Sequence, residues 1–223
     1  MDKHQVGEHK IYSINNPLLF TVDNFLPEEC IDMLLEDIDK HVKFHEAKVV
    51  GEKGGEYKDR RRTNLTGNTI HYLQSTPAQT FLDMAAATLR LHPSQAEPLS
   101  IIKYKIGQQY EAHHDTFPPE TLSEHTPLAG QRIATALLYL TDVQDGGETD
   151  FPKMGVTISP KKGRCVFFST TLMGTDQQND LSFHGALPVN RGEKIAVNLW
   201  FRRGVYDNDM YQKWLENEQN SYK

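Results

Sequence analysis

Apolar residues recur at helical spacing in two stretches of the N-terminal half, residues 26–43 and 76–92. The first stretch carries acidic residues where a helix would have its first turn, which favours a helix start there. The second opens with Thr76 and Pro77, which predict an N-terminal cap followed by proline at the first helical position. We therefore expect two helices. The helically spaced apolar residues of the first are Ile31, Leu34, Leu35 and Ile38.

From Pro98 onward the pattern changes to short runs rich in β-branched and aromatic residues, separated by Gly, Pro and Asp. Helices followed by about six or more short strands are typical of an α+β fold whose strands form a jelly roll or barrel. A last stretch, residues 207–220, predicts a short C-terminal helix that closes over one end. The expected strands are residues 99–107, 132–143, 156–160, 163–170, 181–189 and 193–202.

Length and composition are those of one well-cored domain, or at most two small ones. The 223 residues are 38% hydrophobic and 24% charged, which excludes a wholly disordered chain. A formal net charge of −6 argues against a general nucleic-acid clamp. Two cysteines are too few for a disulfide framework, and no apolar run suits a signal peptide or a membrane span. We expect a cytoplasmic protein without a membrane partner, although a secreted protein processed before residue 1 would look the same.

The stretch YEAHHDTF, residues 110–117, places two histidines and an aspartate side by side. Residues i and i+2 of a strand face the same side, so His113 and Asp115 should point together while His114 faces away. One imidazole and one carboxylate are two thirds of the facial triad that binds Fe(II) in non-haem oxygenases. The pair alone is a weak signal, because a chain with 10 histidines contains a chance H-x-D about once.

A third ligand must come from a distant part of the chain, and His184 stands on an expected strand, unlike His92 and His125. A lone strand histidine is more often a core residue than a ligand. Lys194 strengthens the case, because a lysine that faces a pocket is costly unless it meets an anion. The other reading is an exposed lysine on a one-sided sheet. In an extended strand Lys194 shares its face with Ala196, Asn198, Trp200 and Arg202.

Three blocks of sequence carry a resemblance to a known family: YKIGQQYEAHHD (104–115), RIATALLYLTDVQDGGETDFP (132–152) and FHGALPVNRGEKIAVNLWFR (183–202). Together they resemble the prolyl 4-hydroxylase branch of the 2-oxoglutarate- and Fe(II)-dependent dioxygenases. The resemblance runs from about residue 97 to 203, and more loosely back to 18. It implies a single domain over residues 1–223, with helical support at about 18–92 and a double-stranded β-helix core at about 97–203.

The resemblance also implies a role for individual side chains. Fe(II) would be bound by His113, Asp115 and His184, and the distal carboxylate of 2-oxoglutarate would pair with Lys194. O₂ and ascorbate are the other expected cofactors. One departure concerns the substrate loop, where Asn64 stands in place of the family's serine. The residues implied in supporting roles are Tyr104 and Thr149 toward 2-oxoglutarate, and Arg62, Glu97, Tyr110, Arg132 and Trp200 toward a peptide.

The expected activity is hydroxylation of prolyl residues in a peptide or protein, with release of succinate and CO₂. Two alternatives stay open: a hydroxylase of a free amino acid or small metabolite, and a non-catalytic, cupin-like protein that holds Zn or no metal. Two long polar loops, residues 50–64 and 116–130, favour a peptide, because lids of this size can close over an extended chain. We expect residues 50–64 to form a mobile lid that ends in three arginines able to grip backbone carbonyls or acidic side chains.

Overall fold

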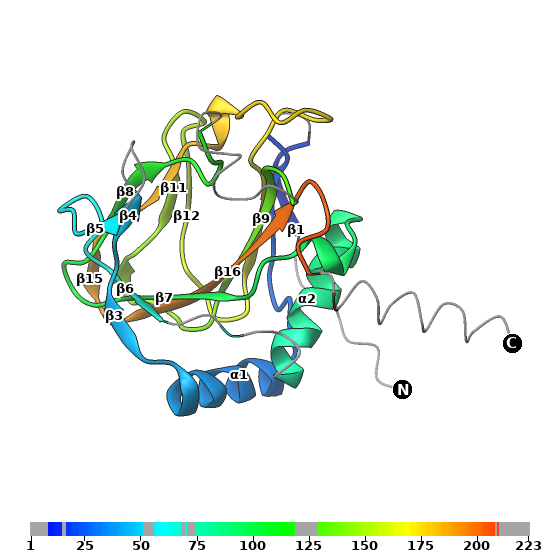
Figure 1. Cartoon of the computed structure of the whole chain (residues 1–223). Coiled ribbons are helices and arrows are strands. Elements are labelled where there is room, and N and C mark those ends of the chain that lie inside the picture. The colour runs from blue at the N-terminus through cyan, green and yellow to red at the C-terminus, as the bar shows by residue number, and fades with distance from the viewer. Residues whose placement is uncertain are drawn as a thin grey trace, which may run out of the picture.

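The computed structural model describes residues 9–14, 17–50, 56–67, 70, 75–118, 129–207 and 209. Within these ranges the chain forms two long helices and two antiparallel sheets, one large and one small, together with two short strand pairs. Figure 1 shows both helices on the outer side of the large sheet, away from the small one. The architecture is α+β, as expected, and is compatible with a jelly roll.

The large sheet has eight strands, and every pairing within it is antiparallel. The longest strands, β9 and β16, lie next to each other at its centre. In spatial order the strands are β1 (His9–Ser13), β2 (Leu19–Val22), β13 (Cys165–Ser169), β9 (Arg132–Tyr139), β16 (Lys194–Arg202), β7 (Ser100–Tyr104), β6 (Leu65–Gly67) and β3 (Phe44–Glu46).

The small sheet has four strands and faces the large one across a shared apolar core. In spatial order they are β12 (Val156–Ile158), β11 (Thr149–Phe151), β14 (His184–Ala186) and β8 (Tyr110–His113). The remaining elements are the pair β10 (Asp145–Gly146) and β15 (Val189–Arg191), the pair β4 (Val49–Val50) and β5 (Glu56–Tyr57), and the 3₁₀ helices η2 (Pro93–Gln95) and η3 (Asp180–Ser182).

Helix α1 (Glu28–His41) buries Ile31, Leu34 and Ile38, while Leu35 is only partly buried. These side chains belong to a cluster that also contains the buried face of α2 and the outward-facing side chains of the large sheet. A second cluster lies between the two sheets. The alternation along the central strands, which sends neighbouring residues to opposite faces, divides the two clusters. In β9, Ala136 and Leu138 belong to the first cluster, and Leu137 and Tyr139 to the second.

Helix α2 (Thr76–Leu89) begins one residue earlier than its sequence indicates. The N-cap is Ser75, not Thr76, because Ser75 has extended backbone angles and its hydroxyl accepts a hydrogen bond from the Ala78 N–H at 3.3 Å. Thr76 is already helical, so the expectation of a threonine cap is wrong. The helix ends at Arg90, whose φ of 55° is left-handed and stops further helical turns.

The expected order of helices first and strands afterwards is wrong for the N-terminal part. β1 and β2 precede α1 and form one edge of the large sheet, and β3 and β6 form the other edge. These strands are only three to five residues long, which is too short for period-2 alternation to distinguish them from loops. Residues 18–92 therefore support the core as strands as well as helices.

Two expectations fall wholly or partly outside the described residues. Of the expected C-terminal helix at 207–220, only residues 207 and 209 are described. Of the two expected loops, residues 51–55 and 119–128 are not described. No helix in the described ranges combines the length and the apolar character needed to cross a bilayer.

Candidate active site

A cavity of about 410 Å³ opens between the two sheets, and most of the expected site residues line it. Lys194, Asn198 and Trp200 contribute from one face of β16, so the expectation that they share a face is confirmed. Glu97 is the exception, because it does not border this cavity. The expected site residues that line it are Arg62, Tyr104, Tyr110, His113, Asp115, Arg132, Thr149, His184, Lys194 and Trp200.

Three side chains meet as a potential metal site: His113, Asp115 and His184, whose candidate ligand atoms lie within 4.8 Å of one another. The pairing of β8 with β14 places His113 directly opposite His184, which joins two distant parts of the chain. Asp115 lies two residues beyond β8, with its Oδ1 3.7 Å from Nε2 of His113 and its Oδ2 3.9 Å from Nε2 of His184. Within the described residues no other group of His, Cys, Asp and Glu has such an arrangement.

The donor set fits a divalent transition metal. The Nδ1 atoms of both histidines lie close to backbone carbonyls, 3.0 Å from Glu111 O and 2.9 Å from Ser182 O. When Nδ1–H donates to a carbonyl, the lone pair of Nε2 is left for a metal. Burial, with further repulsion from His184, lowers the pKa of His113 to about 3, so this ring is neutral near pH 7. Two imidazoles and one carboxylate are the ligands of the Fe(II) facial triad.

His114 is not part of this cluster. Its ring packs against Phe183 with centroids 5.0 Å apart, and the side chain is half-buried at the edge of the cavity. The expectation that His114 faces outward is therefore met only in part, because the chain leaves strand geometry after His113.

Asp115 is held in place from two sides. Its Oδ2 accepts a hydrogen bond of 2.7 Å from the hydroxyl of Thr135, and its backbone carbonyl accepts one of 3.5 Å from Arg132. Burial alone would raise the pKa of Asp115, but His184 and His113, together with Arg132 and the Thr135 bond, hold it below its ordinary value. The carboxylate is therefore ionised and oriented near neutral pH.

Lys194 is 1% exposed, and its ammonium donates to the Gly147 carbonyl at 2.7 Å. It lies over the rings of Tyr104 and Tyr139, at 5.1 and 5.3 Å from their centroids. No carboxylate among the described residues forms an ion pair with it. Burial lowers the pKa of Lys194 to about 7, although Glu148 opposes the shift. A buried ammonium at a cavity wall is the environment that a ligand carboxylate would complete.

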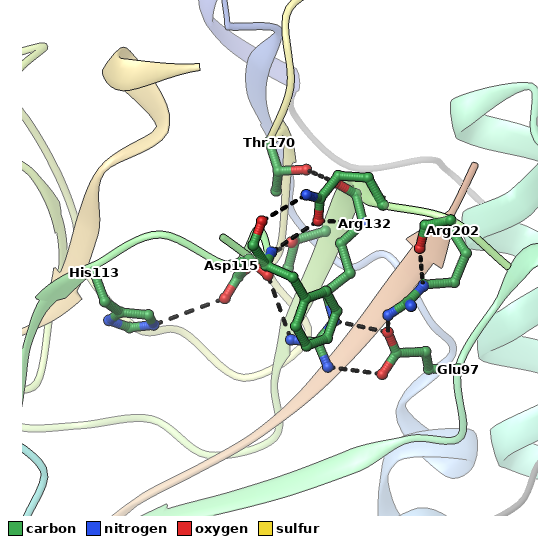
Figure 2. Close-up of polar contacts among 10 residues, drawn as sticks. Glu97, His113, Asp115, Arg132, Thr170 and Arg202 are labelled. Atoms are coloured by element: carbon green, nitrogen blue, oxygen red, sulfur yellow. Dashed lines mark hydrogen bonds and ion pairs between the residues drawn. The ribbon is translucent and has the colours of Figure 1, made fainter. Parts of the chain in front are cut away.

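Glu97 lies behind the cavity wall, where it pairs with two arginines. Arg132 donates to both of its carboxylate oxygens at 2.7 Å, and Arg202 donates to Oε1 at 2.7 Å (Figure 2). Burial alone would raise the pKa of Glu97, but Arg132 and Arg202 hold it below its ordinary value. Arg132 in turn stacks on the ring of Trp200 at 3.7 Å. Glu97 therefore fixes Arg132, which lines the cavity and stacks on Trp200, and does not border the cavity itself.

The segment expected to be a mobile lid is attached to β8 in its described part. Thr63 N–H donates to Gln109 O at 3.0 Å, and Glu111 N–H donates to Arg61 O at 2.7 Å. The guanidinium of Arg62 lies 4.6 Å from the ring of Tyr110, and it donates to the fully buried Asn64 at 3.2 Å. Asn64 thus positions Arg62 from inside. The segment at residues 50–64 that is expected to be a mobile lid therefore has backbone hydrogen bonds to a strand edge near its C-terminal end, a restraint that apolar periodicity does not reveal.

Two buried residues near the cavity were not expected from the sequence. Thr135 binds Asp115, and Tyr139 donates to the hydroxyl of Thr149 at 2.7 Å. A signal was available, because Thr135 and Tyr139 are the hydroxyl-bearing positions of the otherwise apolar run IATALLYL. They are an even number of residues apart and so lie on one face of a strand.

Comparison with known proteins agrees with this geometry. Residues 99–202 match the family described as 2OG-Fe(II) oxygenase superfamily. "Probable prolyl 4-hydroxylase 3" of Arabidopsis thaliana is 30% identical over 85% of this chain and 71% of its own length. "Probable prolyl 4-hydroxylase 9" of the same plant is 37% identical over 58% of this chain, and the match spans about half of that relative, 49%.

Solved structures share the fold. The viral collagen prolyl hydroxylase vCPH of Paramecium Bursaria Chlorella virus-1, in its 2OG complex, has a TM-score of 0.57 and 25% identity over 82% of this chain and 94% of its own. A Trichoplax adhaerens prolyl hydroxylase, in complex with a hypoxia inducible factor peptide fragment, has a TM-score of 0.60 over 82% of this chain and 83% of its own. Its 19% identity shows the fold alone.

A two-histidine, one-carboxylate cluster beside a buried lysine, in a fold shared with these structures, defines the class of protein. The chain belongs to the 2OG-Fe(II) oxygenase superfamily, a class of oxidoreductases. Within that superfamily it belongs to the prolyl 4-hydroxylase branch, so the resemblance seen in the sequence is confirmed.

Proposed function

We propose that this protein is a 2-oxoglutarate-dependent dioxygenase that hydroxylates prolyl residues in a peptide or protein, with release of succinate and CO₂. One observation carries the proposal: the three metal-ligating side chains and the buried Lys194 open into the same cavity. A metal site alone would suit a cupin-like binding protein. A buried ammonium that lacks a carboxylate partner among the described residues adds a place for the anionic end of a cosubstrate.

The proposed contacts fall into three groups: those to the metal, those to 2-oxoglutarate and those to the substrate. His113, Asp115 and His184 would hold Fe(II), which would supply the oxidising chemistry together with 2-oxoglutarate and O₂. Lys194 would pair with the distal carboxylate of 2-oxoglutarate, with the hydroxyls of Tyr104 and Thr149 as further donors. Both are buried, and burial raises the pKa of Tyr104, so its phenol stays protonated and able to donate.

The substrate would bind beside Arg62, Tyr110, Arg132 and Trp200, which line the same cavity. The buried indole Nε1 of Trp200 has no hydrogen-bond partner among the described residues, so it can donate to a substrate carbonyl. Glu97 would act through Arg132, since it does not reach the cavity.

An extended substrate is supported by a second cavity of about 350 Å³ that shares Arg62 with the first. Lys58, Arg60 and Gln108 are among its lining residues. A chain that crosses Arg62 would reach both cavities, whereas a free amino acid would fill only the first. This arrangement favours a peptide over a small metabolite.

Further parts of the proposal concern architecture and setting. We propose one domain over residues 1–223 with a double-stranded β-helix core, which is supported by the two facing antiparallel sheets. We also propose that ascorbate maintains the iron in its ferrous state, as the family resemblance implies. A reducing, cytoplasmic setting is supported by the two cysteines, Cys30 and Cys165, which are both free.

A turnover screen tests this function. Purified protein with Fe(II), 2-oxoglutarate and ascorbate is incubated with proline-rich peptides and, separately, with free amino acids. Succinate is quantified, and products are read by mass. We expect a gain of one oxygen atom on a prolyl residue of a peptide, in proportion to the succinate formed. Oxidation of a free amino acid with no reaction of any peptide would contradict the peptide substrate, and absence of 2-oxoglutarate turnover would contradict the function.

A further inference from the structure

Strand β9 has an inner face whose side chains connect to two different parts of the active site. Thr135, Leu137 and Tyr139 alternate along it, and Leu137 borders the cavity. Thr135 and Tyr139 are 1% and 0% exposed, and each makes one side-chain hydrogen bond to another segment. Since a buried hydroxyl without a partner is costly, these two bonds specify where their acceptors lie.

Thr135 binds Asp115, the candidate metal ligand that does not lie in a strand. His113 and His184 are fixed by the pairing of β8 with β14, whereas Asp115 lies beyond the end of β8. The Thr135 hydroxyl donates to Oδ2 of Asp115 at 2.7 Å, while Oδ1 receives no hydrogen bond from a described residue. The bond therefore restrains the carboxylate through Oδ2, while Oδ1 lies 3.7 Å from Nε2 of His113.

Tyr139 acts at the other end of the cavity. Its phenol donates to the hydroxyl oxygen of Thr149 at 2.7 Å, and both residues are buried. Because Thr149 accepts this bond, its own proton is free to point at a ligand in the cavity. The ring of Tyr139 also lies 5.3 Å from the ammonium of Lys194. Tyr139 thus contacts two of the three groups proposed to receive the cosubstrate carboxylate, Thr149 and Lys194, without lining the cavity itself.

We propose that Thr135 and Tyr139 are positioning residues on one strand: Thr135 orients the carboxylate of Asp115 toward the metal, and Tyr139 orients the hydroxyl of Thr149 toward the cosubstrate. The inference rests on the proposed function, because it assigns the two roles to a metal and to 2-oxoglutarate. The hydrogen bonds go to β11 and to the segment after β8, so one rigid strand aligns both halves of the site.

The test measures binding, not turnover, with Mn(II) as a redox-inactive probe. Mn(II) affinity is measured from the electron paramagnetic resonance signal of free Mn(II), and 2-oxoglutarate affinity by calorimetry on the Mn(II)-saturated protein. The variants are Thr135→Val, which keeps the shape and loses the hydroxyl, Thr135→Ser, which keeps the hydroxyl, and Tyr139→Phe. Thermal unfolding and circular dichroism establish that each variant is folded, and Thr135→Ala replaces the valine variant if that one does not fold.

We expect each substitution to weaken the affinity for one ligand and to leave the affinity for the other nearly unchanged. Thr135→Val weakens Mn(II) binding about 10- to 100-fold, the usual cost of losing a partner of a metal ligand, and Thr135→Ser restores most of it. Tyr139→Phe leaves Mn(II) affinity within about twofold and weakens 2-oxoglutarate about 3- to 10-fold, as expected for one neutral hydrogen bond. A purely structural role would instead lower both affinities together in each variant.

The failure of this inference can be distinguished from the failure of the proposed function. Wild-type protein that binds neither Mn(II) nor 2-oxoglutarate overturns the function, and the positioning roles with it. Wild-type protein that binds both, with unchanged affinities in the folded Thr135→Val and Tyr139→Phe variants, overturns the positioning roles alone. Parallel loss of both affinities in either variant also overturns them.

Discussion

Replacing Lys194 with alanine removes the buried ammonium that would hold the cosubstrate. The side chain is 1% exposed, so its contact with a carboxylate would be shielded from water. A charge-assisted hydrogen bond of this kind contributes about 1.5–3 kcal/mol, which corresponds to about a 10- to 150-fold loss of affinity. The variant should therefore bind 2-oxoglutarate much more weakly, while its affinity for Mn(II) stays unchanged.

The lowered pKa of Lys194 also predicts that 2-oxoglutarate binding is coupled to proton uptake. Without a ligand the pKa is about 7, so above pH 7 the amine is mostly neutral. A bound carboxylate favours the ammonium and raises that pKa, so binding above pH 7 takes up as much as about one proton. The affinity for 2-oxoglutarate should consequently fall as the pH rises above 7.

Calorimetry in buffers of different ionisation enthalpy measures both quantities at once. The Mn(II)-loaded wild-type protein should show proton uptake at pH 8, and the Lys194→Ala variant should show none. Lys105→Ala, which removes an exposed lysine just beyond β7, is the matched control and should behave as wild type. Equal affinity and equal proton uptake in wild type and Lys194→Ala would refute the assignment of this lysine to the cosubstrate.

Three other predictions follow from the same geometry. His113→Ala should abolish iron-dependent turnover while His114→Ala keeps most of it, and equal losses would show that the wrong histidine has been assigned. Glu97→Gln should lower the free energy of unfolding by about 3 kcal/mol or more in a denaturant titration, because it leaves buried arginines unpaired; Glu36→Gln, in an exposed pair, is the control. In the ligand-free protein, between about pH 7 and 10.5, the unfolded chain binds more protons at Lys194 than the folded chain does. The free energy of unfolding should therefore rise with pH in that window, and it should rise less in Lys194→Met.

The metal cluster shows how far sequence reasoning reaches. Strand parity selected His113 over His114, and the structure places His113 in the cluster. Strand parity alone does not place Asp115, which lies two residues beyond β8 and accepts a hydrogen bond from Thr135. The pairing that sets His184 opposite His113 joins distant strands, and no local pattern encodes such a register.

Glu97 shows why supporting residues are harder to place. Its position two residues after η2 gives no indication that its partners are Arg132 and Arg202, the first residue of β9 and the last of β16, which the antiparallel pairing sets opposite each other. The sequence suggests that Glu97 faces the substrate, whereas in the structure it is buried behind the cavity wall. The alternating pattern of β16, by contrast, is long enough to predict which side chains face the cavity.

The most direct test of the central claim is the anomalous diffraction from crystals grown without oxygen in the presence of Mn(II) and 2-oxoglutarate. We expect one strong anomalous peak bounded by His113, Asp115 and His184, with 2-oxoglutarate extending from the metal to the ammonium of Lys194. A metal bound elsewhere, or 2-oxoglutarate density that does not reach Lys194, would contradict the account.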